Sequence, residues 1–337
     1  MKQRRVSGQI SIQINWIFVL IVGAIILGFF ITVINNQERR SSAEQATELV
    51  EAIDNIFTTI STNPNTIDTF TIRNANVEFT CEPGLSNYYI QGAGPVDTTH
   101  RSLYSSTTLR GSTIATWTRT LYVPFEATTL TYLADDRTVF LFVKSTTGGL
   151  VERLHGELPE AFAKMLVDPG NLANLQLSAY QRVVIIAPDD ITFAPPQDAH
   201  VRIIPSQPNF DDVFTVRFAQ GTNDVDSSVF TEQLLWAAIF AEDKEYYECN
   251  TRKALTRIGH LTSILHNRTA TLKDETHAYD RCYDFLTSGA TTLNTLKSGL
   301  TAEISFSPLL LHVKEANDKL VATHKLIQRG GLCPYIY

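Results

Sequence analysis

Three pairs of adjacent aspartates are the residues of this chain whose types best suit chemistry, because paired carboxylates bind hard cations such as calcium or exchange protons with a substrate. They are Asp135-Asp136, Asp189-Asp190 and Asp211-Asp212. None follows the Asp-x-Asp-x-Asp spacing of a calcium loop, and each lies in a segment that we predict to turn, where aspartate hydrogen-bonds the local backbone. We therefore predict that these carboxylates stabilise turns and bind no metal.

The histidines and glycines carry no stronger signal. His260 and His266 are six residues apart and His312 and His324 are twelve apart, whereas two metal ligands on one helix face are four apart. The nucleophile elbow, the zinc helix, the Walker A loop and the G-x-G-x-x-G turn are all missing from the sequence. The glycines of 91–95 precede a proline that lacks the amide an anion would use, so this segment is predicted to turn. We predict no catalytic, cofactor-binding or metal-binding residue.

The four cysteines, Cys81, Cys249, Cys282 and Cys333, form no C-x-x-C motif, which disfavours zinc and predicts two disulfides in an oxidising compartment. Three pairings are possible. We favour Cys249 with Cys282, because each lies beside a helical segment and the pair would clamp two antiparallel helices, which leaves Cys81 with Cys333. An outside location also makes the tripeptide that begins at Asn267 a weak candidate for N-glycosylation.

One uncharged apolar segment, Trp16–Ile34, is about as long as a helix needs to be to cross hydrocarbon. Lys2, Arg4 and Arg5 precede it, which by the positive-inside rule places the N-terminus in the cytoplasm. We therefore expect a transmembrane helix over 9–36 in contact with membrane lipid, and a single-pass location in the cell membrane with the C-terminal part outside the cytoplasm.

The helix is expected to continue beyond this segment. Glu38–Ile60 contains no glycine or proline, and four apolar residues recur there on one helical face: Leu49, Ile53, Ile56 and Ile60. We predict a continuous helix from about Ile12 to Ile60, whose part at 37–62 forms an extension or stalk that packs on a globular head.

The residues around Gly8 resemble an archaeal class III signal peptide, as found in type IV pilin-like surface proteins. Three residues match that family's Q-x-S-x-E-x-x-x-L pattern: Gln9, Ser11 and Ile17. Gln13 stands where the family has glutamate, and Ser7 stands where it has a basic residue. The resemblance covers about the first 35 residues. It implies that a prepilin peptidase cleaves the basic leader 1–8 between Gly8 and Gln9, and that the N-terminal helix packs against itself or other pilin-like subunits.

The segments after the stalk predict an α+β fold. Short runs rich in Thr, Val, Tyr and Phe between glycines and prolines are typical of strands. These runs are Asn76–Thr80, Asn87–Ile90, Thr113–Tyr122, Thr138–Val143, Arg182–Ala187, His200–Ile204 and Val213–Phe218. Leu150–Leu177 is predicted as helix and loop. We expect a β-rich head domain over 69–225.

The last third of the chain predicts a helical bundle over 226–330, with Gly289, Gly299 and Pro308 as breaks. The expected helices are Phe230–Cys249, Thr251–Leu272, Glu275–Ser288, Thr291–Ile304 and Pro308–Gln328.

Composition and the missing motifs favour a structural role. A formal charge of −7 without clustered Lys and Arg argues against nucleic acid as a partner. We predict an extracytoplasmic protein with a structural, adhesive or envelope-assembly role, pilin-like, and the large head favours a minor pilin or pseudopilin. The alternative is a membrane-tethered hydrolase whose site is built from scattered residues, and an enzyme is the less favoured reading.

Overall fold

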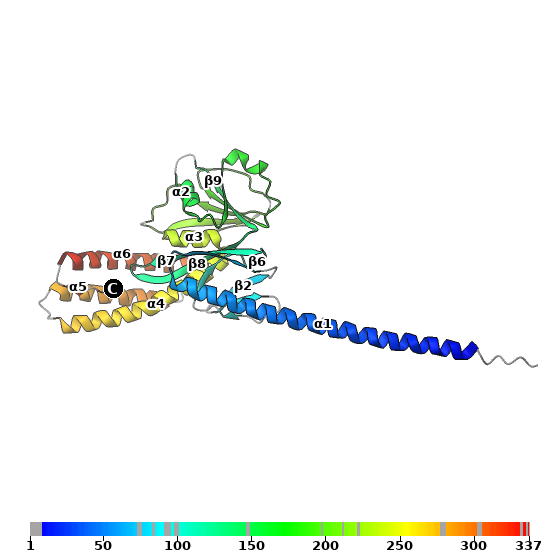
Figure 1. The fold of residues 1–337 in the computed structure, drawn as a ribbon. Helices are drawn as coiled ribbons and strands as arrows, with labels where there is room; N and C mark the ends of the chain where they lie inside the picture. The colour runs from blue at the N-terminus through cyan, green and yellow to red at the C-terminus, as the bar shows by residue number, and fades with distance from the viewer. Residues whose placement is uncertain are drawn as a thin grey trace, which may run out of the picture.

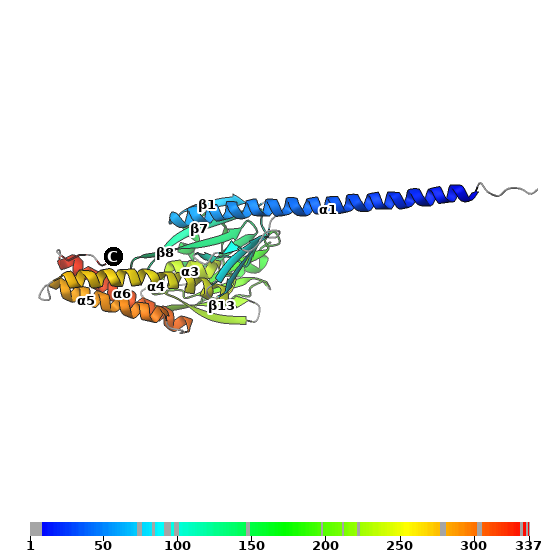
Figure 2. The same cartoon turned by 90° about the horizontal axis from the view of Figure 1, so that it is seen from below.

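A computed structural model of the chain describes residues 9–72, 76–82, 85–90, 96–97, 101–145, 149–196, 198–210, 212–220, 223–276, 281–301, 305–330, 333–334 and 336. The molecule is α+β and elongated (Figures 1 and 2). A helix projects from one side of a β-rich head, and three long helices extend from the opposite side.

The projecting helix, α1, runs without a break from Gln9 to Thr62, which is 54 residues. Its first part stands away from the head and its last turns lie against it (Figure 1). Two buried side chains, Ile53 and Phe57, mark the part that packs on the head.

Within the described ranges, no helix is both long and apolar enough to cross a membrane. A helix that crosses hydrocarbon needs about 20 consecutive residues that are predominantly apolar. No described helix meets the conditions of length and apolarity together. The expected transmembrane helix over 9–36, and with it the expected single-pass location in the cell membrane, is therefore wrong.

The first sheet has the order β1-β7-β8-β5. Its strands are β1 (Ile67–Thr71), β5 (Ser102–Tyr104), β7 (Thr113–Tyr122) and β8 (Glu126–Asp135). β7 and β8 form a long antiparallel hairpin in which Trp117 lies opposite Tyr132, and β5 pairs in parallel with β8. β7 coincides with a predicted strand.

The second sheet has six strands in the order β10-β9-β11-β12-β13-β14. The first four are parallel and the last two are antiparallel. The strands are β9 (Thr138–Val143), β10 (Ala163–Val167), β11 (Arg182–Pro188), β12 (His200–Ile204), β13 (Phe214–Gln220) and β14 (Asn223–Val229). Helix α2 (Leu150–Glu157) and the 3-10 helix η1 (Pro169–Asn174) connect β9, β10 and β11. The prediction of helix and loop throughout 150–177 is wrong at β10, which pairs with β9.

A small third sheet, in the order β4-β3-β2-β6, lies beside helix α4. Its strands are β2 (Val77–Glu82), β3 (Leu85–Ile90), β4 (Val96–Asp97) and β6 (Thr108–Leu109). The disulfide between Cys81 on β2 and Cys249 on α4 joins this sheet to the helical part of the chain.

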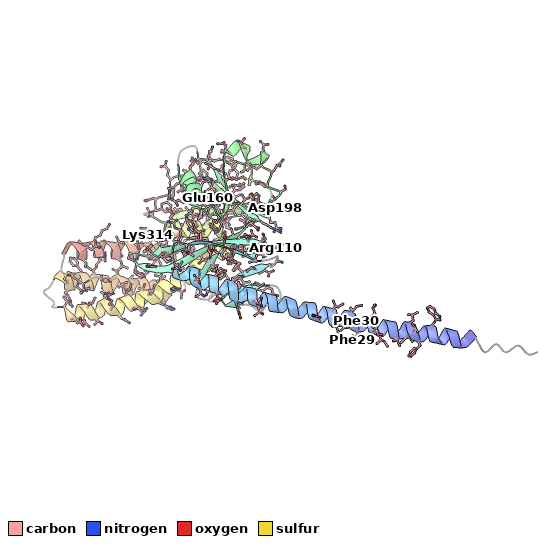
Figure 3. All side chains as sticks on the ribbon, viewed as in Figure 1. Phe29, Phe30, Arg110, Glu160, Asp198 and Lys314 are labelled. Carbon is pink, nitrogen blue, oxygen red and sulfur yellow. A yellow bond between two sulfur atoms is a disulfide. The ribbon has the colours of Figure 1, made fainter. Side chains whose placement is uncertain are left out.

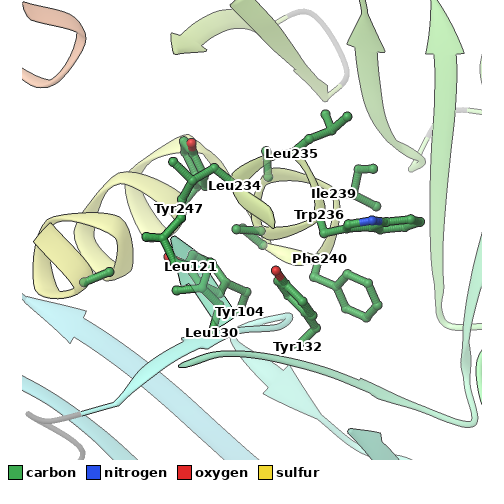
Figure 4. Packing of buried hydrophobic residues seen from close by; sticks show 14 of the residues in the cluster. Tyr104, Leu121, Leu130, Tyr132, Leu234, Leu235, Trp236, Ile239, Phe240 and Tyr247 are labelled. Atoms are coloured by element: carbon green, nitrogen blue, oxygen red, sulfur yellow. The ribbon is translucent and has the colours of Figure 1, made fainter. Parts of the chain in front are cut away.

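Helix α3 (Glu232–Phe240) lies between the β1-β7-β8-β5 sheet and the six-stranded sheet, and every residue from Leu234 to Phe240 is buried. Its aromatic side chains contact both sheets, and Figure 4 shows Phe240 beside Tyr132 of β8. The Trp236 ring lies 5.1 Å from Trp117 of β7, and the Phe240 ring lies 5.3 Å from Tyr132 of β8 and 4.8 Å from Phe140 of β9. A helix that is apolar on all sides is expected in such a place.

The long helices are α4 (Lys244–Glu275), α5 (Arg281–Thr301) and α6 (Phe306–Gly330). Two predicted helix boundaries are wrong. The chain breaks at Ala241, before the Asp243 cap of α4, and continues as helix through Cys249 to Thr251. Gly289 lies inside α5, where a Cβ atom would approach Ile336 Cδ1 to 2.4 Å, so this glycine makes room for a packing contact and does not end a helix. One hydrophobic core runs from α1 through the sheets into α6, across the predicted boundary at 226.

All four cysteines form disulfides, as predicted, but the favoured pairing is wrong. The bonds are Cys81–Cys249, with 6.1 Å between Cα atoms, and Cys282–Cys333, with 5.3 Å. Because α4 and α5 are antiparallel, Cys249 lies near the head whereas Cys282 lies at the far end, and the helix from Cys249 to Glu275 is ~39 Å long. A disulfide needs Cα atoms about 4.4–6.8 Å apart.

Two buried arginines satisfy the carbonyl groups at the end of α3. Arg202 of β12 donates to the carbonyls of Ala238, Ala241 and Glu242, and its guanidinium lies 4.3 Å from the Phe218 ring. Arg182 of β11 adds two more hydrogen bonds, to the carbonyls of residues 240 and 241. The last carbonyls of a helix have no partner within the helix, and cations are favourable at its C-terminus. The arginines therefore make it possible to bury α3.

Replacing Arg202 by methionine keeps the aliphatic stem and removes the guanidinium, which leaves several buried carbonyls without donors. We expect Arg202→Met to lower the free energy of unfolding by about 3–5 kcal/mol, measured by chemical denaturation. Arg217→Met, on the neighbouring strand and exposed, is the matched control and should cost less than about 0.5 kcal/mol. Equal losses in the two variants would contradict the capping role.

Candidate functional site

The most distinctive surface of the molecule is the free part of α1, from Trp16 to Ile34, which we call the apolar segment. Among its described side chains, thirteen large apolar ones are exposed: Trp16, Phe18, Val19, Leu20, Ile21, Ile25, Ile26, Leu27, Phe29, Phe30, Ile31, Val33 and Ile34. Figure 3 shows Phe29 and Phe30 on the helix, far from the head. A soluble protein rarely exposes so many contiguous apolar side chains without a partner for them.

The apolar segment is exposed on every side. Runs of consecutive residues such as Phe18–Ile21 and Phe29–Ile31 are exposed together, and successive residues of a helix point about 100° apart. A single groove on a partner covers one stripe of a helix. Covering this segment therefore requires neighbours on several sides.

The rest of the described chain, head and long helices together, has no matching apolar surface. Its exposed large apolar side chains are scattered over different elements, as is ordinary for a globular protein. They are Ile67, Tyr89, Tyr122, Val225, Ile264, Leu311 and Leu326. The apolar segment is thus set apart from the rest of the described surface.

Polar and aromatic contacts fix α1 on the head. Arg101 Nη1 donates to Asp54 Oδ1 at 2.7 Å, and Nη2 donates to Thr58 Oγ1 at 2.8 Å. The Tyr88 hydroxyl donates to the Val50 carbonyl at 3.1 Å, and its ring meets the buried Phe57 ring edge to face at 5.8 Å. Burial and the nearby Asp54 carboxylate raise the pKa of Tyr88 to about 12, so this hydroxyl keeps its proton near neutral pH. The head therefore holds α1 in a defined direction.

A second candidate is a small polar cavity of about 230 Å³ where β9, β11 and β12 begin. His200 Nε2 lies 3.4 Å from Glu242 Oε1, and Arg182 Nε lies 3.4 Å from Glu242 Oε2. Burial and the Arg182 charge lower the pKa of His200 to about 4, so its imidazole is neutral at pH 7 and a weak base.

The contacts of this cavity lead to the end of α3. His200 Nδ1 is buried and makes no hydrogen bond among the described residues, so it is not paired with a hydroxyl or thiol in this structure. The Arg182 guanidinium is already bonded to the end of α3. We therefore assign this cluster to the support of α3, and it gives no support to the hydrolase alternative.

The aspartate pairs bind backbone and hydroxyl groups. Asp135 Oδ2 accepts from the amides of Arg110 and Gly111, and its Oδ1 accepts from Thr138 Oγ1. Asp136 accepts from the amide and hydroxyl of Ser112. Gly111 is needed for this approach, because a Cβ atom there would lie 2.0 Å from Asp136 Oδ1. The pair clamps 110–112 to the β8–β9 turn.

The second pair is also engaged, since Asp189 Oδ1 accepts from the Ser206 amide and Asp190 Oδ2 accepts from Ser145 Oγ. Asp211 lies outside the described residues, as do the predicted turn at 91–95 and Gly8 of the predicted cleavage site. Gln9 is the first residue of α1. Leader cleavage stays a prediction.

The four histidines that the sequence analysis weighed as metal ligands, His260, His266, His312 and His324, lie on the long helices. His266 Nδ1 and the Ala290 carbonyl are 3.0 Å apart, as are His312 Nε2 and the Thr295 carbonyl, so these rings link neighbouring helices. In the portion of the chain that the structure describes, no three potential metal ligands converge.

The candidate glycosylation site lies on α4. Asn267 is exposed, but Thr269 is buried and its hydroxyl donates to the Leu265 carbonyl. The tripeptide is therefore helical, whereas glycosylated asparagines are typical of surface loops.

Comparison with known proteins yields no relative: no protein family, no curated protein and no solved structure matches this chain. The two disulfides are consistent with an extracellular protein.

The contact between α1 and the head can be tested with one substitution at two places on the same helix. Phe57→Ala removes a buried ring, and we expect it to lower the free energy of unfolding by about 3–5 kcal/mol. Phe30→Ala removes an exposed ring, and in dilute solution it should change stability by less than about 0.5 kcal/mol. A tolerated Phe57→Ala would show that α1 is not fixed on the head as described.

The buried His200 predicts a pH dependence. The unfolded chain takes up a proton at this side chain near pH 6.5, whereas the native pKa is about 4 because of burial, Arg182 and Arg202, opposed by Glu242. The native state is therefore favoured above pH 6.5, and this stabilisation is lost as the pH falls toward 4. Denaturation at pH 6.5, 5.5 and 4.5 should show a smaller decline in His200→Gln than in the wild type. Identical slopes would contradict the assignment.

Proposed function

We propose that this chain is a pilin-like structural subunit that assembles with further copies of itself through the apolar segment of α1. The observation that carries the proposal is the exposure of thirteen large apolar side chains on all sides of a helix that the head holds in a fixed direction. Such a helix is expected to be buried in the working form of the protein.

Identical copies are the partner that best fits this surface. The described head exposes only scattered apolar side chains, so it does not provide a complementary face. The apolar segments of other copies do, and in a bundle of parallel helices each segment has neighbours on several sides. A pilin-like arrangement therefore places the segments inside an assembly and the heads outside it.

The free energy gained by burying the apolar segment is sufficient to drive association. At about 1.5–3 kcal/mol for each fully buried side chain, thirteen side chains contribute roughly 20–40 kcal/mol as an upper limit. Association and ordering cost about 4–15 kcal/mol. Partial burial of the segment would thus still favour the assembly.

The finer role is that of a minor pilin or pseudopilin, with structural, adhesive or envelope-assembly work done by the large head. Its support is the resemblance of the sequence around Gly8 to a class III signal peptide. Removal of the basic leader by a prepilin peptidase would then precede assembly.

Sedimentation velocity over a range of concentrations tests the proposal. The wild type should form oligomers, and Leu20→Gln combined with Leu27→Gln should raise the concentration needed for assembly at least tenfold, because polar side chains then enter the helix contacts. Ile67→Gln, which removes an exposed apolar side chain on the head, is the control and should assemble like the wild type. A monomeric wild type at every concentration, or unchanged assembly of the double variant, would refute the proposal.

A further inference from the structure

The six-stranded sheet is covered unevenly. Its first face packs on α2 and α3 and belongs to the main core. Its second face is covered over β9, β10, β11 and part of β12 by a smaller cluster that includes Leu172 of η1. Ala219 is the one residue of β13 that joins this cluster in the described part of the chain, and Thr215, Arg217, Asp224 and Asp226 are exposed.

The uncovered face is the floor of a groove of about 670 Å³, with the segment 189–195 as one wall. Two rows of paired residues cross the floor from β12 through β13 to β14. The strand register places the members of each row opposite one another, on the same side of the sheet. One row is Val201, Ala219 and Asp224, and the other is Ile203, Arg217 and Asp226. The groove thus changes from apolar at β12 to charged at β14.

The charges of the groove are mainly acidic. Arg217 Nε lies 3.2 Å from Asp226 Oδ1, so the one basic residue among the described lining residues is already paired. Asp189 and Asp224 add two further carboxylates at the edges. The groove therefore suits an occupant that combines an apolar side chain with a cation.

The chain itself carries such a surface. The segment 244–330, which holds the long helices and their connections, has twelve Lys and Arg against nine Asp and Glu, a net charge of +3. The rest of the chain has a net charge of −10, which gives the total of −7. On α4, Ile264 is 64% exposed and Arg268 follows it on the same face at i+4, also exposed. An apolar side chain and a cation thus stand one turn apart.

The placement of the two surfaces favours contact between different copies. The long helices leave the head on the side opposite α1 (Figures 1 and 2). Copies that are staggered along a bundle of α1 helices would bring the long helices of one copy beside the head of the next. The groove and this helix face are different parts of one copy, so the contact can repeat from copy to copy without closing.

We propose that the groove of one copy receives α4 of a second copy, with Ile264 over the apolar floor at Ile203 and Arg268 beside Asp224 and Asp226. This inference rests on the proposed function and adds to it the lateral contact between heads. The contact is heterologous and electrostatically matched, so higher ionic strength weakens it.

Charge reversal tests the contact. Asp224→Lys with Asp226→Lys should weaken assembly about tenfold in sedimentation velocity, because two attractive pairs become repulsive. Arg268→Glu should weaken it several-fold. The chain that carries all three changes should recover to within about threefold of the wild type, since the charges match again. Asp198→Lys, an exposed acid outside the groove lining, is the control and should leave assembly unchanged.

The outcomes separate this inference from the proposed function. Assembly that depends on Leu20 and Leu27 but ignores the reversals, or that the triple change weakens further, overturns the groove contact and leaves the role of α1 intact. Association that depends on the reversals but ignores Leu20→Gln with Leu27→Gln supports the contact and overturns the role of α1. Saturable binding of a small cationic probe such as arginine ethyl ester to the groove, without any effect of the reversals on assembly, would show that the groove takes a ligand instead of a second copy.

Discussion

The burial of α3 is the constraint on which the rest of the structure depends. Its side chains from Leu234 to Phe240 are all buried between two sheets, so the carbonyls at its end are out of reach of water and must find donors in the protein. Arg202 and Arg182 provide them from adjacent strands of the six-stranded sheet. At the other end, Thr231 caps the helix, and Glu232 accepts from Arg119 of β7 and Arg153 of α2. Both sheets are therefore tied to one buried helix by charged hydrogen bonds.

This arrangement fixes the positions of two surfaces, the apolar segment of α1 and the exposed face of α4, through which we expect copies to associate. The turn after α3 starts α4, which leaves the head as a long helix and carries Ile264 and Arg268 away from it. β8 and Tyr88 of β3 support the last turns of α1. A head that is rigid between these points gives the apolar segment and the long helices a constant relation. Such a relation is needed if many copies are to repeat one geometry.

Local sequence patterns predicted seven of the fourteen described strands, β2, β3, β7, β9, β11, β12 and β13, but not the elements that depend on distant partners. Thr113–Tyr122 and Thr138–Val143 were predictable because β-branched and aromatic residues gather between turn residues. Ala163–Val167 contains Ala, Lys, Met and Leu, which favour helix, and its pairing with β9 overrides that preference. Gly289 was predicted to break a helix because glycine disfavours helices. Its actual role is to make room for Ile336, which is distant in the sequence, so the local pattern could not reveal it.

The candidate sites also divide into those that contiguous residues form and those that distant contacts form. The apolar segment is contiguous, so the sequence alone identified it, although the inference of a membrane-spanning helix from it was wrong. The cysteine pairing failed because it depended on which ends of α4 and α5 meet. The caps of α3 were missed, yet a signal was present: Arg182 and Arg202 stand within apolar strands, and an arginine there must find buried partners. The groove was not predictable, because its rows form only by the pairing of β12, β13 and β14.

The most direct measurement of the central claim is backbone hydrogen exchange of the full chain, followed by mass spectrometry at low and high protein concentration. If copies assemble through the apolar segment, amides of 16–34 should exchange more slowly as concentration rises, while the buried strands β9 and β11 stay equally protected at both. Exchange of 16–34 that does not depend on concentration, in samples shown to contain assemblies, would contradict the account.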